Sequence, residues 1–106
     1  MTEKNTEKTT TQALLEKLMG RKNSVVIDLE GVELKFNRDD VAYDAFFNDV
    51  EAKNKLTPMK DYLLTIIDRE QRDLLVQLVQ IPDVAATLLA KVNEAFVPKL
   101  EAKLKN

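Results

Sequence analysis

Carboxylates are the only side chains with acid–base or metal-binding chemistry that this sequence concentrates in one place. Between residues 37 and 51, five acids accompany a single base. Asp39, Asp40 and Asp44 have the chemistry to bind a divalent cation or to act as a general acid and base. Neighbouring aspartates point about 100° apart on a helix, however, and the D-x-D-x-D-G spacing of a calcium loop is absent. We interpret these residues as the acidic first turn of a helix.

Other catalytic side chains are scarce. The sequence contains no His and no Cys, and its single serine, Ser24, has no imidazole to activate it, although a Ser–Lys pair stays open. Gly20 and Gly31 are too far apart for a phosphate-binding loop. The lack of Cys also excludes disulfides and thiolate metal sites and fits a reducing compartment. We predict a protein that is not an enzyme and needs neither a cofactor nor a metal.

Size, charge and hydropathy narrow the class of protein further. A chain of 106 residues forms one domain, and a net charge of -2 argues against a protein that coats nucleic acid. No apolar run approaches the roughly 20 residues of a membrane span, and the N-terminal stretch lacks the apolar segment of a secretory signal. We expect a cytoplasmic protein that binds neither nucleic acid nor a membrane.

Charge is distributed unevenly along the chain. Residues 91–106 contain four lysines and two glutamates, opposite in sign to the acidic stretch. Two interpretations stay open. Asp39 and Asp40 match the dipole at the start of one helix while Lys103 and Lys105 match the end of another; alternatively, the two regions form a charge-matched docking surface.

Two short apolar alternations joined by Glu30-Gly31 predict an antiparallel β-hairpin at about residues 24–36. Gly31 supplies the positive φ that a two-residue turn needs, and Asp28 then lies opposite Glu33 with like charge. A lone hairpin is marginal, so we expect helices to cover its apolar face or another strand to extend it. The predicted cross-strand pairs are Leu29 with Val32, Ile27 with Leu34 and Val25 with Phe36.

Ahead of the hairpin, the sequence predicts a flexible segment over residues 1–8 and then a short helix. The helix begins at the T-x-x-Q capping box of Thr9 and Gln12 and ends at Gly20 in a left-handed conformation. A helix of this length does not hold itself together in water, so its apolar side chains must lie on the domain core, the outcome we expect, or on a partner. These side chains are Leu14, Leu15 and Leu18.

After the hairpin, Asn37 predicts the N-cap of a helix over about residues 38–53. Large apolar side chains recur there with helical spacing, which favours a core stripe that covers the sheet over a binding site. The members of this stripe are Tyr43, Phe46, Phe47 and Val50.

Two further start signals follow. Thr57 as the cap and Pro58 at the first helical position open the next helix. Asp68 marks a joint on the surface, so the stretch to about Val79 forms two helices and not one long helix.

The last helix begins after Ile81-Pro82-Asp83 and is kinked or broken at Pro98, ahead of a mobile amphipathic segment over residues 98–106. Together these elements define an α+β fold dominated by helices, in a single domain over residues 9–106. It consists of a short N-terminal helix, one antiparallel β-hairpin and three or four packed helices.

Three stretches follow one another along the chain: V-V-I-D-L-E-G-V-E-L-K-F, N-R-D-D-V-A-Y-D-A-F-F-N-D-V and I-P-D-V-A-A-T-L-L-A-K-V-N-E-A-F-V-P-K-L. In this order the chain, over about residues 24–104, resembles the small tail assembly chaperones of tailed bacteriophages and prophages. The resemblance implies a protein that binds the tape measure protein, keeps it soluble and helps recruit the tail tube protein in the bacterial host cytoplasm. It supplies no catalytic residue.

A chaperone for an apolar helix needs an exposed apolar strip that stays hydrated when empty, and the segment after Pro98 has that character. The alternative is an ordinary terminal helix that folds back over the hairpin. The predicted partner contacts are Phe96, Lys99, Leu100, Lys103, Leu104 and Lys105.

The free edge of the hairpin is a second candidate surface, where an added strand would pair one copy with another in a homo-oligomer. Two other classes of protein share this small size and lack of catalytic groups. One is a phage-encoded inhibitor of a host enzyme or defence complex, which would form a discrete complex with a host protein. The other is a structural assembly subunit, which would persist in the mature particle.

Overall fold

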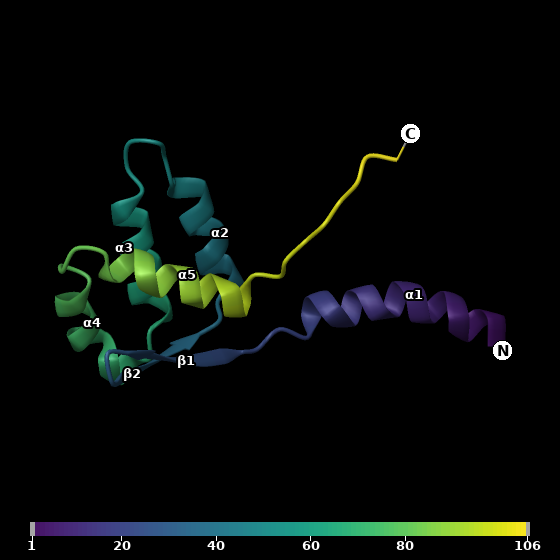
Figure 1. Ribbon diagram of the computed structural model, residues 1–106, viewed down its shortest axis with the longest axis horizontal. Helices are drawn as coiled ribbons and strands as arrows, with labels where there is room; N and C mark the ends of the chain where they lie inside the picture. The colour runs from purple at the N-terminus through teal and green to yellow at the C-terminus, as the bar shows by residue number, and fades with distance from the viewer. Residues whose placement is uncertain (1, 106) are drawn as a thin grey trace.

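The computed structural model describes the backbone of residues 2–105 and the side chains of residues 10–105. Over these residues the chain has a hairpin with four α-helices after it and one before it, which confirms the predicted helix-dominated α+β fold. Figure 1 shows their arrangement. The elements are α1 (Thr2–Met19), β1 (Ser24–Leu29), β2 (Val32–Asn37), α2 (Asp40–Asp49), α3 (Leu56–Ile66), the 3-10 helix η1 (Arg69–Gln71), α4 (Arg72–Leu78) and α5 (Val84–Phe96).

The hairpin has the predicted register, with Leu29 opposite Val32 next to the turn. Glu30 and Gly31 have φ values of 51° and 90°, the left-handed pair of a type I′ turn, and the Asp28 carboxylate accepts a hydrogen bond from the Gly31 N–H at 2.7 Å. This side-chain bond compensates in part for a glutamate in a conformation that a Cβ disfavours. The turn therefore closes as the sequence indicates.

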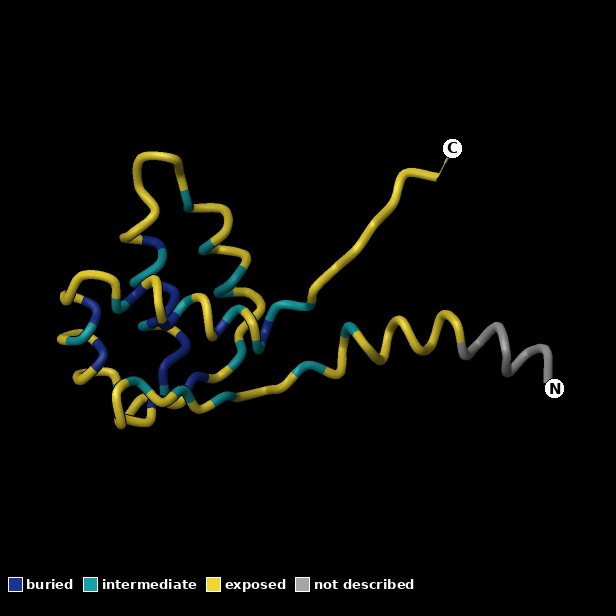
Figure 2. Tube along the Cα trace, in the orientation of Figure 1, coloured by how far each residue is buried: buried dark blue, intermediate teal, exposed yellow. Residues whose placement is uncertain are grey.

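The core lies between the hairpin and the helices that follow it. Leu34 and Phe36 of β2 are fully buried, and helices α3, α4 and α5 contribute apolar side chains to the same core. Figure 2 marks the buried residues of these elements in dark blue. Helices rather than a third long strand thus cover the apolar face. The buried helical side chains include Leu63, Ile66, Leu75, Leu88, Val92 and Phe96.

The joint between α3 and α4 is only partly on the surface, where it was predicted: Asp68 is half-buried and Arg69 and Glu70 are exposed, but Ile67 is buried. Two helices do form, but Ile67 between them is extended, pairs with Phe36 as an isolated antiparallel bridge and is only 6% exposed. Helix α3 ends at this point because Ile67 and its neighbours pair with the edge of the hairpin instead of continuing the helix.

Polar groups from the same joint occupy the outer edge of β2. The Asp68 N–H donates to the Lys35 carbonyl at 2.8 Å. The side-chain amide of Gln71 accepts from the Lys35 N–H at 2.8 Å and donates to the Glu33 carbonyl at 2.7 Å. The outward-facing N–H and carbonyl of Lys35 and the carbonyl of Glu33 are therefore satisfied within the chain.

Helix α2 is shorter than predicted at both ends. Asn37 pairs with Ser24 in the hairpin and cannot cap the helix; the Asp39 carboxylate does so, accepting from the Ala42 N–H at 3.0 Å. The helix stops at Asp49 because residues 51–54 form a tight turn closed by two backbone hydrogen bonds. Strand pairing before the helix and the tight turn after it therefore limit its length at both ends.

The aromatic stripe of α2 covers α3 and not the sheet. Tyr43 and Phe46 are half-buried against Tyr62, with ring centroids at 5.9 and 5.4 Å, whereas Phe47 is 67% exposed. Burial raises the pKa of Tyr62 to about 12, with smaller contributions from Tyr43 and from the acids at the start of α2.

Helix α3 begins at Leu56, one residue before the predicted cap. Thr57 lies inside the first turn and Pro58 is the third helical residue, where its missing N–H leaves no hydrogen bond unmade. Helix α5 ends at Phe96, and Pro98 breaks it as predicted. Residues 97–105 then run without regular structure, so Lys103 and Lys105 do not lie at a helix end as expected.

Helix α1 differs from its prediction in start, end and position. It begins at Thr2, well before the Thr9 box, and Gly20 follows it without a positive φ. A Cβ at Gly20 would lie 2.6 Å from the Glu16 carbonyl oxygen, so glycine is needed there for close approach. The flexibility predicted for residues 1–8 and 98–106 stays a prediction.

The expected core packing of α1 is wrong. Leu14 and Leu15 are 55% and 45% exposed, because α1 runs away from the domain (Figures 1 and 2). Over the residues that the structure describes, none of the helices is long and apolar enough to cross a membrane.

Candidate functional site

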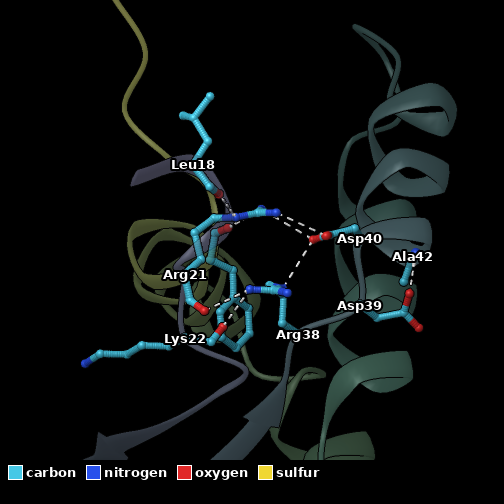
Figure 3. Close-up of polar contacts among 8 residues, drawn as sticks. Leu18, Arg21, Lys22, Arg38, Asp39, Asp40 and Ala42 are labelled. Carbon is cyan, nitrogen blue, oxygen red and sulfur yellow. Dashed lines mark hydrogen bonds and ion pairs between the residues drawn. The ribbon is translucent and has the colours of Figure 1, made fainter. Parts of the chain in front are cut away.

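Two segments leave the domain at one end, and a polar cluster that we call the arginine junction holds both of them. The junction consists of Arg21, Arg38, Asp40 and the carbonyl groups that these arginines reach (Figure 3). Arg21 donates through Nε to the Leu18 carbonyl at 2.8 Å and through Nη1 to the Phe96 carbonyl at 3.0 Å. One guanidinium therefore joins the end of α1 to the end of α5.

Arg38 completes the junction from the other side. Its Nη1 donates to the carbonyls of Arg21 and Lys22 at 3.0 and 3.2 Å, and its Nε lies 3.6 Å from an Asp40 carboxylate oxygen. Arg21 also contacts the Asp40 carboxylate, through two nitrogens at 3.2 and 3.4 Å. The carboxylate is half-exposed, so the ion pairs are screened and the hydrogen bonds to carbonyls carry more of the stability.

The junction assigns the acidic residues a local role. Asp39 caps α2 and Asp40 binds two arginines, which favours the helix-start interpretation of these acids over a docking surface. In the described part of the chain, acidic side chains form no cluster of three or more that could hold a metal ion. The acids thus belong to the scaffold.

The N-terminal arm, which is α1, carries an unpartnered apolar stripe. Leu14 and Leu18 are one helical turn apart, as are Leu15 and Met19, so the four side chains share a face. Met19 is 71% exposed and Leu18 is partly exposed, apart from the domain core. Because these leucines do not pack on the domain core, the geometry favours the alternative prediction, in which they contact a partner.

The C-terminal arm, residues 97–105, is extended and equally unpartnered. Leu100 and Leu104 are 72% and 90% exposed, far more than an apolar side chain packed on its own domain. Lys103 lies 3.9 Å from Glu101 in a contact open to solvent. The terminal helix folded back over the hairpin, the alternative to a partner-binding segment, is absent from the described chain.

The predicted contact residues do not all lie on this arm. Phe96 is 2% exposed and belongs to the core beneath the hairpin, so the prediction that it anchors a partner directly needs correction. Its buried ring and its carbonyl, bound by Arg21, instead fix the base of the arm. Partner contact by the other residues, Lys99, Leu100, Lys103, Leu104 and Lys105, stays a prediction.

Sequence reasoning missed the two arginines. Arg21 stands in a short basic run that reads as ordinary surface, and its partner Phe96 lies 75 positions away. The available signal was local: Arg38 directly precedes two aspartates, a pattern that suggests an ion pair but not which carbonyls the arginine reaches.

The comparisons with known proteins agree with the resemblance inferred from the sequence. The chain is 52% identical over 101 residues to an uncharacterized 11.3 kDa protein in the lys 3′ region of Haemophilus phage HP1 (strain HP1c1), with 94% of this chain and 99% of that protein covered. No solved structure matches. A family model described as phage tail assembly chaperone matches residues 25–106, the hairpin, the later helices and the C-terminal arm. The chain therefore belongs to the phage tail assembly chaperone family.

Proposed function

We propose that this chaperone binds the tape measure protein in the cytoplasm of the host bacterium, keeps it soluble and helps recruit tail tube subunits. Membership of the family gives the chain a role in tail assembly, and a chaperone's role is not enzymatic. The observation that carries the finer proposal is the placement of exposed apolar side chains on two arms that leave one end of the domain.

The chemistry of the arms suits a long apolar helix as the client. Leu14, Leu15 and Met19 on one arm and Leu100 and Leu104 on the other offer aliphatic contacts without any polar group to desolvate. Leu100 and Leu104 share a face once the arm becomes helical, so we expect the arm to fold as it binds. The lysines of the arm keep it hydrated when no client is present. They are Lys99, Lys103 and Lys105.

Co-expression with a tape measure protein tests the proposal. Deleting residues 98–106 should leave the chaperone folded, because no core side chain is removed, while the client precipitates. A double variant, Leu100→Asp with Leu104→Asp, should do the same at full length. Val41→Asp is the matched control, since Val41 is 79% exposed on α2 and belongs to neither arm. Client in the soluble fraction is the quantity measured.

The outcomes separate the surfaces. If the arm variants still keep the client soluble while Leu14→Asp does not, the client lies on α1 instead. If neither arm matters, the proposal that the arms hold the client fails. Recruitment of the tube has its own measurement, which is capture of tail tube protein by the chaperone with its client bound and not by either component alone.

A further inference from the structure

The two edges of the hairpin differ in how their backbone groups are used. On β2, the N–H and carbonyl of Lys35 and the carbonyl of Glu33 are bonded, by Asp68 and Gln71. The register places Val26 opposite Lys35 and Asp28 opposite Glu33. In an antiparallel ladder, Val26 and Asp28 therefore direct their N–H and C=O groups away from β2, toward the free edge of β1. No backbone or side-chain hydrogen bond within the described chain reaches those groups on β1.

A groove of about 640 Å³ runs along this free edge. Residues 25–28 of β1 line one side of it and Lys91, Glu94 and Ala95 of α5 line the other, and residues 20–22, ahead of β1, also line it. Successive strand residues point to opposite faces of a sheet, so a groove that touches all of residues 25–28 follows the edge and not one face. The groove therefore offers an extended segment the free backbone groups of β1 and the apolar side chains of Val25, Val26 and Ile27.

The C-terminal arm has the pattern of such a segment. From residue 99 to residue 105, charged and apolar side chains alternate strictly, as they do in a strand with one buried face. The charged positions are Lys99, Glu101, Lys103 and Lys105, and the apolar positions are Leu100, Ala102 and Leu104. Seven extended residues span about 23 Å, close to the length of β1.

We propose that residues 99–105 of one copy of this chain pair, as an added strand, with the free edge of β1 in a second copy. The arm is directed to a neighbour because Val97, with φ -104° and ψ 123°, continues the chain outward from α5, away from the hairpin of its own domain (Figure 1). Return to its own β1 would require a reversal at Val97-Pro98, where Pro98 fixes φ.

The faces match in this pairing. Cross-strand neighbours lie on the same side of a sheet, so Leu100, Ala102 and Leu104 meet the side of β1 that carries Val25 and Ile27, beneath α5. The charged face of the arm then meets the side that carries Val26 and Asp28, both exposed, where the Asp28 carboxylate is acidic and the arm is mostly basic. The leucines leave solvent, and the unpaired backbone groups of β1 gain partners.

Such a contact joins different surfaces on the two copies. Each copy that is added through a single contact again presents a free arm at one end and a free edge at the other, so an open chain of copies follows unless two copies exchange arms or the chain closes into a ring. The biological role of this pairing rests on the proposed function, because a tape measure helix and the β1 edge of a second copy would compete for Leu100 and Leu104. In the helical arm Ala102 lies about 200° from Leu100, off the client face, whereas in the strand it shares the buried face.

Sedimentation velocity of the full chain without client tests the proposal. We expect concentration-dependent self-association, with a Kd on the order of 100 µM for so short a strand. Val26→Pro removes one outward-facing N–H, and Ala102→Glu places a charge on the buried face of the arm; each should weaken association about tenfold or more. Val26→Ala keeps the N–H and Glu101→Gln alters only the charged face, so both controls should associate like the wild type.

A mixture of the two defective variants provides the decisive result. Val26→Pro retains its arm and Ala102→Glu retains its edge, so mixing them should restore one contact and give a one-to-one dimer that grows no further. The inference is wrong if the wild type stays monomeric up to about 1 mM, a concentration well above the expected Kd. It is also wrong if Ala102→Glu associates normally, as two hairpin edges pairing directly would predict. Should Val26→Pro fail to fold, the Ala102→Glu and Glu101→Gln pair still decides the matter.

The client experiment keeps the two proposals separate. Ala102→Glu should lose self-association but still keep the tape measure protein soluble, because residue 102 is off the helical client face. A monomeric wild type that holds its client would overturn the pairing and leave the proposed function intact. A wild type that self-associates while its client precipitates would support the pairing and overturn the proposed function.

Discussion

Leucines in the core and leucines in the arms differ in whether they have a partner within the domain. Leu34, Leu63 and Leu88 are fully buried beneath and beside the hairpin, whereas Leu14, Leu100 and Leu104 are mostly exposed on segments that leave it. Both groups sit in amphipathic patterns. The difference is that α3 and α5 return across the hairpin, while α1 precedes it and the C-terminal arm leaves α5 in an extended conformation. Apolar spacing therefore shows that a residue needs a partner, and topology decides whether that partner is internal.

The arginine junction stands at the boundary between these regions. It ties the base of each arm to α2 through Arg21 and Arg38, so the arms start from fixed points although their apolar side chains have no partner in the domain. A client that binds both arms would then lose less conformational freedom than one bound by two unattached tails.

The largest expected effect tests the comparison directly. Leu88→Ala removes a fully buried side chain of α5 and should lower the free energy of unfolding by about 2 to 5 kcal/mol. Leu104→Ala, at 90% exposure, should change it by less than about 0.5 kcal/mol. Urea denaturation followed by circular dichroism measures both. A large loss at Leu104 would mean that the C-terminal arm packs on its own domain in solution.

The packed region should also respond to alkali through Tyr62. Because burial raises its pKa to about 12 from 10.0, the folded chain keeps the phenol proton in a pH range where the unfolded chain loses it. This contribution to stability is complete below pH 10 and falls as pH rises from about 10 to about 12, by roughly 1.4 kcal/mol per pH unit.

Urea midpoints of wild type and Tyr62→Phe across this range measure the difference. The variant lacks the ionisable group, so the gap between the two curves should change only above pH 10. Parallel curves would show that Tyr62 is hydrated in the folded state.

The junction should have an intermediate effect. Arg21→Ala removes hydrogen bonds from a charged group to the Leu18 and Phe96 carbonyls and should cost about 1 to 2 kcal/mol. Arg21→Lys should not restore the loss, because an ammonium cannot reach both carbonyls and Asp40 in one plane. The adjacent exposed Lys22→Ala is the control. Limited proteolysis near residues 18–23 gives a second measurement, with faster cleavage expected only in the Arg21 variants.

Much of the packed region follows from local pattern. The alternation on either side of Glu30-Gly31 determines the hairpin register, since a slip by one residue would turn every apolar side chain to the wrong face. Element ends were less predictable where two local preferences compete. Asn37 is a good cap and also a strand residue, and pairing with Ser24 decided for the strand.

The candidate site was predictable only in part. The apolar spacing of Leu100 and Leu104 marked the C-terminal arm, but the same kind of spacing placed Leu14 and Leu15 in the core, because sequence alone does not show whether a helix returns to its domain. Apart from the Arg38–Asp40 pair, the junction could not be found, since Arg21 pairs with Asp40 19 positions away and with Phe96 at the far end of the domain.

The smallest expected effect concerns the hairpin turn, which is remote from both arms. Glu30 has a φ of 51°, a left-handed conformation that asparagine adopts more readily than glutamate, so Glu30→Asn should stabilise the chain by about 0.5 to 1 kcal/mol. Both residues keep the Asp28 bond to the Gly31 N–H, which limits the change to the turn itself. If client holding depends on the arms and not on overall stability, this variant should keep the same fraction of tape measure protein soluble as the wild type while its urea midpoint rises. A rise in client solubility that follows the rise in midpoint would instead mean that the packed domain, and not the arms, limits the chaperone's activity.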